Sequence, residues 1–149
     1  MATPRQRPYV QFNFQVDLGH GVQASFQECS NIGMEVTVAE YRTGDYKDNN
    51  VMKITGLNKA TDVTLKRGVI GSLDLYQWLD DIRRGNQEDG QAVRTVVVRL
   101  MAEDHSGPVQ TWNLKGARII KHISGPLNAK GTDVAMEELT IAYEQLTME

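Results

Sequence analysis

Residues 10–18 read Val-Gln-Phe-Asn-Phe-Gln-Val-Asp-Leu, and this stretch indicates the fold class. Its apolar side chains occupy every second position, which is the period of a strand with one buried and one solvated face. The same alternation returns at 22–29 and at 34–38, with a tight turn predicted at Gly19-His20-Gly21 and a break at 30–33. Successive strands that each keep one wet face predict an antiparallel meander.

The remainder of the chain continues this pattern of short strands and polar connections. Alternating or β-branched runs predict further strands at 51–55, 62–67, 93–101, 109–123 and 134–146. Polar or turn-forming residues predict connections at 42–50, 56–59, 85–91 and 124–131.

One segment, residues 72–84, has the period of a helix. Ser72 is a candidate N-cap, and Gly85 is a suitable stop. Asp74 in the first turn, with Arg83 and Arg84 in the last, complements the helix dipole. Its apolar stripe predicts packing on the sheet, with Trp78 and Tyr76 as the anchors. The stripe consists of Leu75, Trp78, Leu79 and Ile82.

Composition predicts an ordinary globular domain. The chain has 149 residues, 40% hydrophobic and 23% charged, which fits a single domain over 1–149. Its net charge of -3, from 16 basic and 19 acidic side chains, argues against a dedicated nucleic-acid binder. Cys29 is the single cysteine, so an internal disulfide and a paired-cysteine metal site are excluded, and we expect it to fill apolar space.

Residues 1–8 are polar and basic with no apolar run behind them, so no signal peptide is predicted. No stretch approaches the roughly 20 apolar residues needed to cross a bilayer. We therefore expect folding in a cytoplasm and no membrane anchoring by this chain.

Candidate catalytic and metal-binding residues form no convincing constellation. His20, His105 and His122 are scattered without metal-ligand spacing. Asp80-Asp81 and Glu137-Glu138 are sequence neighbours, whose side chains point in different directions in a helix or strand. No enzyme, cofactor or metal site is predicted. A pocket built from scattered residues would leave no such signature. The residues alone thus indicate a small barrel or sandwich with one helix.

The order of short motifs resembles the tail-tube protein family of contractile-tailed phages and extracellular contractile injection systems, and more distantly the type VI secretion tube protein. The matching stretches cover nearly the whole chain. They are, in order, Phe12-Asn13-Phe14-Gln15-Val16, Phe26-Gln27-Glu28-Cys29-Ser30, Met34-Glu35-Val36, Glu40-Tyr41-Arg42-Thr43-Gly44, Lys53, Gly56-Leu57-Asn58-Lys59, Val63-Thr64-Leu65-Lys66-Arg67-Gly68, Leu75-Tyr76-Gln77-Trp78, Trp112-Asn113-Leu114, Gly125-Pro126-Leu127-Asn128-Ala129 and Thr132-Asp133-Val134-Ala135-Met136-Glu137-Glu138-Leu139.

The resemblance implies a mainly β fold with one α-helix, a small antiparallel barrel or sandwich of tail-tube type that assembles into hexameric rings. It implies rings stacked into a hollow tube inside a contractile sheath, driven through a target envelope on contraction. The implied partners are further copies of the chain, a sheath protein, a baseplate or tube initiator, and a tape-measure protein, cargo or DNA in the lumen. The implied location is the bacterial cytoplasm during assembly, and afterwards a phage virion or an extracellular or cell-associated injection particle.

By the same resemblance, residues 43–53 are expected to protrude and to join one ring to the next, and the N-terminal arm, residues 1–8, to order against a neighbour. The inter-ring candidates are Thr43, Gly44, Asp45, Tyr46, Lys47, Asp48, Asn49, Asn50 and Lys53.

A hairpin over residues 22–41 is expected to turn one apolar face to the core of its own subunit and a polar face to the lumen. The core-facing residues are Val22, Ala24, Phe26, Val36 and Val38. The lumen-lining candidates are Gln23, Ser25, Gln27, Glu35 and Thr37.

Two alternatives to a tube subunit stay open at this stage. One is a tube-initiator or baseplate paralogue, which shares the fold and forms a single ring. The other, of a different class, is a small β-barrel that binds an apolar ligand, although the predicted strands carry enough large side chains to fill such an interior.

Overall fold

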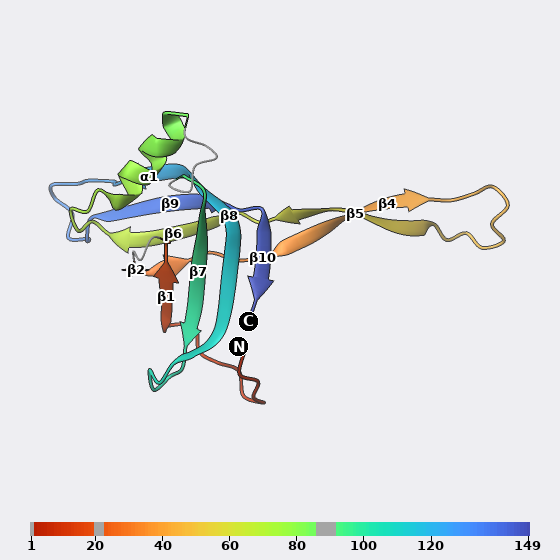
Figure 1. Cartoon of the computed structure of the whole chain (residues 1–149), viewed down its shortest axis with the longest axis horizontal. Helices are drawn as coiled ribbons and strands as arrows, with labels where there is room; N and C mark the ends of the chain where they lie inside the picture. The colour runs from red at the N-terminus through yellow and green to blue at the C-terminus, as the bar shows by residue number, and fades with distance from the viewer. Residues whose placement is uncertain (1, 20–22, 86–91) are drawn as a thin grey trace.

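The computed structural model describes residues 2–19, 23–85 and 92–149, and within them the chain forms ten strands and one helix (Figure 1). This confirms the predicted fold class, mainly β with one helix. Every strand pair is antiparallel. The elements are β1 (Phe14–Asp17), β2 (Gln23–Ala24), β3 (Glu28–Cys29), β4 (Met34–Tyr41), β5 (Met52–Ala60), β6 (Val63–Gly68), α1 (Asp74–Arg83), β7 (Arg94–Met101), β8 (Pro108–Ser124), β9 (Met136–Ala142) and β10 (Gln145–Met148).

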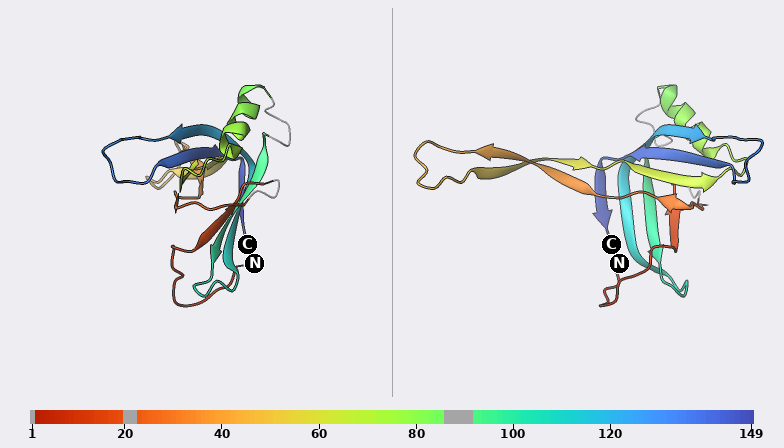
Figure 2. Two further views of the ribbon diagram at one scale, coloured as in Figure 1. Left: turned by 90° about the vertical axis from the view of Figure 1, so that its left-hand side faces the viewer. Right: turned by 180° about the vertical axis from the view of Figure 1, so that it is seen from behind.

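The long strand β8 organises the body because it belongs to two sheet halves. Its first part pairs with β7 on one side and β10 on the other, and β7 continues to β1 and β2. Its last part pairs with β9, which continues to β6 and β3. The two halves run in clearly different directions, so the sheet wraps around a common interior (Figures 1 and 2). Among the described strands the sheet ends at β2 and at β3 and does not close into a barrel.

Gly116 lies where β8 passes from one half to the other. Its φ is +64°, a left-handed conformation that suits glycine, and the pairing with β7 slips by a bulge beside it. A Cβ placed on Gly116 would lie 2.9 Å from Cδ of Glu144, in the short link between β9 and β10. The predicted single strand 134–146 is therefore divided, because each of its parts follows a different half of the sheet.

The core lies between the two halves and against the helix. Val16 and Leu18 come from the first predicted strand, and Leu139 and Ile141 from β9, as the alternation indicates. That first strand is shorter than predicted, since it begins at Phe14 and leaves Phe12 71% exposed. The buried core consists of Val16, Leu18, Phe26, Val63, Leu65, Leu75, Trp78, Val96, Val98, Leu114, Ala117, Ile119, Leu139, Ile141 and Tyr143.

Helix α1 packs against β8 and adds two residues to the core, Leu75 and Trp78. The Trp78 indole N–H donates to the carbonyl of Ala92 at 2.6 Å, which satisfies its one buried donor. Tyr76, by contrast, is 48% exposed, so its predicted anchoring role is wrong.

The ends of the helix differ slightly from the prediction. The helix begins two residues after Ser72, and Leu73 occupies the N-cap position without a side-chain cap. Ser72 instead accepts a long hydrogen bond from the Asp74 amide, at 3.4 Å. At the other end Gly85 has a φ of +94°, as expected for a C-terminal stop.

The β4–β5 hairpin, residues 34–60, projects from the body as a separate two-stranded sheet (Figures 1 and 2). The predicted hairpin over 22–41 is wrong, because β2, β3 and β4 each pair with a different partner, namely β1, β6 and β5. The predicted turn at 56–59 is also wrong. These residues lie inside β5, where a bulge opposite Thr37 takes up the extra residue.

Candidate functional site

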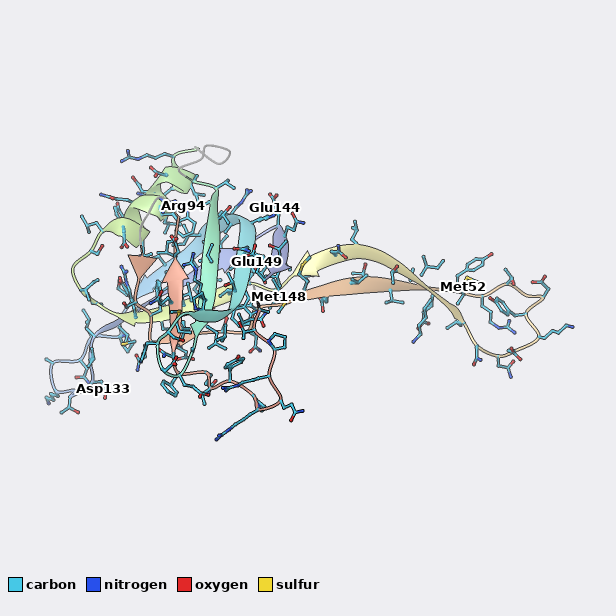
Figure 3. All side chains as sticks on the ribbon, turned by 60° about the horizontal axis from the view of Figure 1, so that its bottom comes forward. Met52, Arg94, Asp133, Glu144, Met148 and Glu149 are labelled. Carbon is cyan, nitrogen blue, oxygen red and sulfur yellow. The ribbon has the colours of Figure 1, made fainter. Side chains whose placement is uncertain are left out.

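The hairpin is solvent-exposed on both faces. All of β4, and β5 up to Lys59, is exposed, although the strands carry apolar side chains. Val38 is 52% exposed and Leu57 83% exposed. Figure 3 shows side chains standing off both sides of the ribbon, Met52 among them. The expectation that Val36 and Val38 pack in the core of their own subunit is therefore wrong, whereas Phe26 is buried and Ala24 packs against the core.

The inter-ring candidates gather at the far end of this hairpin. Residues 43–50 form its tip, and Lys53 lies on β5 opposite Glu40. The tip is held by its own hydrogen bonds, because the Arg42 guanidinium donates to the carbonyls of Tyr46 and Asp48 at 3.4 and 3.2 Å. The Asp45 carboxylate accepts hydrogen bonds from the Thr43 side chain and from the backbone amide of Asp45 itself. Both lower the pKa of Asp45, which keeps this tip carboxylate charged.

Tyr143 fixes the root of the hairpin to the body. Its hydroxyl donates to the carbonyl of Gly33 at 2.9 Å and accepts from the Gly33 amide at 3.2 Å. Gly33 immediately precedes β4, and its carbonyl also accepts from the amide of Thr61, just after β5. Sequence reasoning missed this role, since Tyr143 appears there only as one more residue of an alternating strand.

The lumen candidates are divided between two places. Ser25 and Gln27 are exposed on the body beside β3, whereas Glu35 and Thr37 are exposed on β4 of the hairpin. The Thr37 hydroxyl donates to the carbonyl of Leu57 at 3.1 Å, across the bulge. The side chain of Gln23 lies outside the described part of the chain, as does Val22.

A groove lies between the two ends of the wrapped sheet, and we call it the seam groove. It has a volume of about 750 Å³. One wall comes from residues 27–32 around β3, and the other from residues 9–12 with the first residue of β1, Phe14. Three side chains of β7 and β8 also line it, namely Val98, Leu100 and Trp112. Sequence reasoning did not identify this groove, because its residues are distant in sequence and carry no common motif.

Cys29 lines the seam groove and is partly buried. Burial raises the pKa of its thiol to about 11, so the thiol is protonated and unreactive near neutral pH. This agrees with the expected role as an apolar filler.

The predicted N-terminal arm contacts its own body. The Thr3 amide donates to the carbonyl of Val109 at 2.9 Å, and Arg5 forms an ion pair with Glu103 at 2.7 Å. The Arg5 guanidinium also lies 3.7 Å from the centre of the Tyr9 ring. The arm thereby holds residues 9–12 in place as a wall of the seam groove.

A buried ion network explains one of the matched motifs, residues 63–68. Arg67 is 3% exposed, and its Nε lies 2.5 Å from Glu137 Oε1 on β9. Its Nη2 lies 2.7 Å from Asp74 Oδ1 at the start of α1. His122 adds a contact of 3.2 Å from Nε2 to the second oxygen of Glu137. The network joins β6, β8, β9 and the helix, which makes it a structural element of the body.

Within residues 2–19, 23–85 and 92–149 no group of three or more potential metal ligands comes together. No helix in the described part of the chain has the length and apolar character needed to cross a membrane.

Comparison with known proteins places this geometry in a family. The profile of the T4-like virus tail tube protein gp19 family matches residues 10–147, which includes the hairpin, the ion network and the lining of the seam groove except Tyr9. The chain belongs to this tail tube protein family. The family is described as a tail tube protein of T4-like viruses.

Solved structures with the tail-tube fold match over nearly the full chain. The tube-terminating cap of the anti-feeding prophage has a TM-score of 0.83 at 23% identity, covering 100% of this chain and 95% of that one. The sheath-tube complex of an extracellular contractile injection system, PVC, has a TM-score of 0.83 at 24% identity, covering 97% and 93%. Hcp1 from Flavobacterium johnsoniae is more distant, with a TM-score of 0.55 at 11% identity, covering 92% and 94%. A comparison with curated proteins found no match.

Proposed function

We propose that the chain is a structural subunit of the inner tube of a contractile injection system or contractile phage tail. Six copies close into a ring, and rings stack around a lumen that carries cargo or DNA. The tube is driven through a target envelope when the sheath contracts. The observation that carries this proposal, beside family membership, is the exposed apolar hairpin. A two-stranded ribbon is marginally stable alone in water, so its side chains require cover from another copy.

The similar structures suggest the partners. They come from a sheath-tube complex, a tube-terminating cap and a baseplate described with sixfold symmetry. By this analogy the subunit contacts a contractile sheath along the tube and a baseplate or initiator at its end. A tape-measure protein, cargo or DNA occupies the lumen. Assembly takes place in the bacterial cytoplasm before the finished particle leaves the cell.

Within this proposal the hairpin tip joins neighbouring rings. Residues 43–50 and Lys53 are the inter-ring contacts, since they lie farthest from the body on a ribbon clamped at its root. Ser25, Gln27, Glu35 and Thr37, with Gln23, line the lumen. The four whose side chains are described are exposed and polar or acidic, and such a wall offers DNA few places to bind.

Electron microscopy of the purified chain tests the function directly. We expect sixfold rings and hollow tubes in negative stain. Deletion of residues 45–50 shortens the tip and leaves the body intact, so we expect folded subunits that no longer form tubes. A monodisperse monomer at high concentration would reject the tube function, and normal tubes from the deletion variant would reject the role of the tip.

A tube-initiator or baseplate component is the second candidate. Chains from a tube-terminating cap structure and from a baseplate structure share this fold at TM-scores of 0.83 and 0.82, which supports this second role. Single rings that never stack, at any concentration, would favour this role over that of a tube subunit.

A further inference from the structure

We propose that Met52 is a site of reversible oxidation, at which hydrogen peroxide converts the thioether to a sulfoxide and so keeps the subunit from joining a tube. The proposal rests on the proposed function, because it takes the hairpin tip as the contact between rings. It adds a covalent modification, through which the oxidant concentration around dispersed subunits controls their assembly.

Met52 lies at the outer end of the hairpin. It is the first residue of β5 and pairs with Tyr41, the last residue of β4. Its side chain is 45% exposed, and Figure 3 shows Met52 on the projecting ribbon, away from the body. A small oxidant in the solvent can therefore reach this thioether in the dispersed chain.

The Met52 side chain also lines a cleft at the hairpin tip, which we call the tip cleft. The cleft has a volume of about 460 Å³, and Tyr41 and Tyr46 line it together with Met52. Its other lining residues are Thr43, Asp45, Lys47 and Asp48. Thioether sulfur makes favourable contacts with aromatic rings. The apolar surface of the tip cleft thus comes from three side chains, one of which becomes polar on oxidation.

The oxidation step needs no catalytic residue. The Met52 sulfur attacks one oxygen of hydrogen peroxide, so that an S–O bond forms while the O–O bond breaks. The proton on the transferred oxygen passes to the departing hydroxide, which leaves as water. Sulfur loses two electrons and the peroxide gains them. The sulfoxide is a strong hydrogen-bond acceptor in place of a weak one, and burying it in a contact without a donor is unfavourable.

Two other exposed methionines lie away from the tip cleft and distinguish position from residue type. Met34 is 37% exposed at the root of the hairpin, where it pairs with Ala60. Met148 is 59% exposed on β10 of the body. Both should react with peroxide, but neither lines the tip cleft. The proposal requires that loss of assembly follow the sulfoxide at Met52 and not at these two positions.

Peroxide treatment of the dispersed full chain, followed by assembly, tests the proposal. Every protein carries Cys29→Ser, which removes the single thiol. Peptide mass spectrometry gives the sulfoxide fraction at each methionine, and light scattering with electron microscopy gives the amount of tube. We expect tubes to fall several-fold as Met52 is oxidised. Two methionine sulfoxide reductases, one for each sulfoxide epimer, should restore them with a dithiol as the electron source.

Three leucine variants serve as matched controls, since leucine replaces methionine with little change in volume and has no sulfur to oxidise. Met52→Leu should form as many tubes after peroxide as before it, whereas Met34→Leu and Met148→Leu should lose them as the parent protein does. An equal loss of tubes from treated Met52→Leu would overturn the proposal.

A glutamine variant gives a readout that needs no oxidant. Met52→Gln places a polar carbonyl at about the position of the sulfoxide oxygen, so we expect it to stay dispersed at concentrations where the parent protein forms tubes. Tubes from Met52→Gln at the concentration that the parent needs would contradict the role of Met52.

Oxidation of tubes that have already formed separates this inference from the tube function. If the next ring covers the tip, the sulfoxide at Met52 should form several-fold more slowly in tubes than in the dispersed chain. Equal rates would overturn the inference and leave the tube function standing. Untreated parent protein that never forms tubes would instead reject the tube function, and with it a role of Met52 in assembly.

Discussion

Arg67 is a buried charged side chain, so the free energy of burying it depends on its ion-pair partners. Its guanidinium lies between Glu137 and Asp74; the side chains of Arg67 and Glu137 are nearly inaccessible to water, whereas that of Asp74 is partly exposed. Removing one member of a buried ion network leaves the others charged and desolvated, which costs about 3–5 kcal/mol. We therefore predict that Arg67→Met lowers the free energy of unfolding by this amount, measured by urea denaturation.

The neighbouring Lys66→Met serves as the control for Arg67→Met. Lys66 is exposed enough for water to screen its contact with Glu138, which is 4.0 Å long. Its replacement should change stability by about 0.5 kcal/mol or less. Equal losses from the two variants would contradict the structural role of the network.

Asp74 gives the network a pH dependence. Burial alone would raise the pKa of its carboxyl, but the hydrogen bonds from Arg67 and Ser72 outweigh burial and lower the pKa below its ordinary value of 3.8. The folded state then holds the carboxylate more strongly than the unfolded chain does. The stabilisation is complete above the ordinary value and is lost as pH falls through the lowered folded-state pKa.

We predict a pH-dependent loss of stability for the variant Asp74→Asn. The measurement is the free energy of unfolding of the variant and of wild type, by denaturation from neutral pH to below the ordinary carboxyl pKa. At about pH 7 the variant should be less stable by roughly 1.5–3 kcal/mol, because a charged hydrogen-bond acceptor is lost. The difference should narrow steadily below the ordinary carboxyl pKa. A difference that is constant from neutral to strongly acid pH would show that Asp74 is not the linked group.

At the scale of elements, the bend in β8 depends on one glycine. Gly116→Ala forces a left-handed φ on a residue with a Cβ and brings that atom against Glu144. We predict a loss of about 1–3 kcal/mol in the free energy of unfolding, measured by thermal or urea denaturation. Gly107→Ala is the control, since its Cβ would meet no atom within 4 Å and its φ is not positive. A neutral Gly116→Ala would mean that the bend has another cause.

The strands were predictable from sequence where their own chain covers them. Val16 and Leu18, or Leu139 and Ile141, alternate with polar residues because one face of each strand meets the core. Val36 and Val38 alternate equally well, yet both are exposed on a projecting ribbon. Alternation reports that a strand face is apolar, and it does not say whether the cover comes from the same chain or from another copy.

Of the candidate surfaces, the hairpin tip was predictable from the sequence, whereas the seam groove was not. The hairpin tip at 43–50 stands out in the sequence because it is polar, aperiodic and flanked by strands. The strand through Gly56 and Asn58 was not predictable, since such residues usually end a strand and here a bulge accommodates them. The seam groove and the Tyr143 clamp join residues far apart in sequence, so only the tertiary structure brings them together.

For the whole molecule, the hydrogen bonds between Tyr143 and Gly33 join the root of the hairpin to the body. Tyr143→Phe removes two hydrogen bonds to Gly33 and keeps the packing of the ring. We predict a loss of about 0.5–1.5 kcal/mol in stability. We also predict a higher protein concentration for tube formation, followed by light scattering and electron microscopy. Unchanged assembly at equal concentration would show that the hairpin is aimed by other contacts.

Strand β8 also has a mechanical consequence. Its seventeen residues are bonded along their length to β7, β9 and β10, so one continuous backbone crosses both halves of the sheet. A force directed along that backbone acts on many interstrand hydrogen bonds at the same time, in shear. Because they share the load, the hydrogen bonds do not break one after another. A particle that must push a hollow rod through a barrier without buckling would benefit from subunits that resist stress in this way.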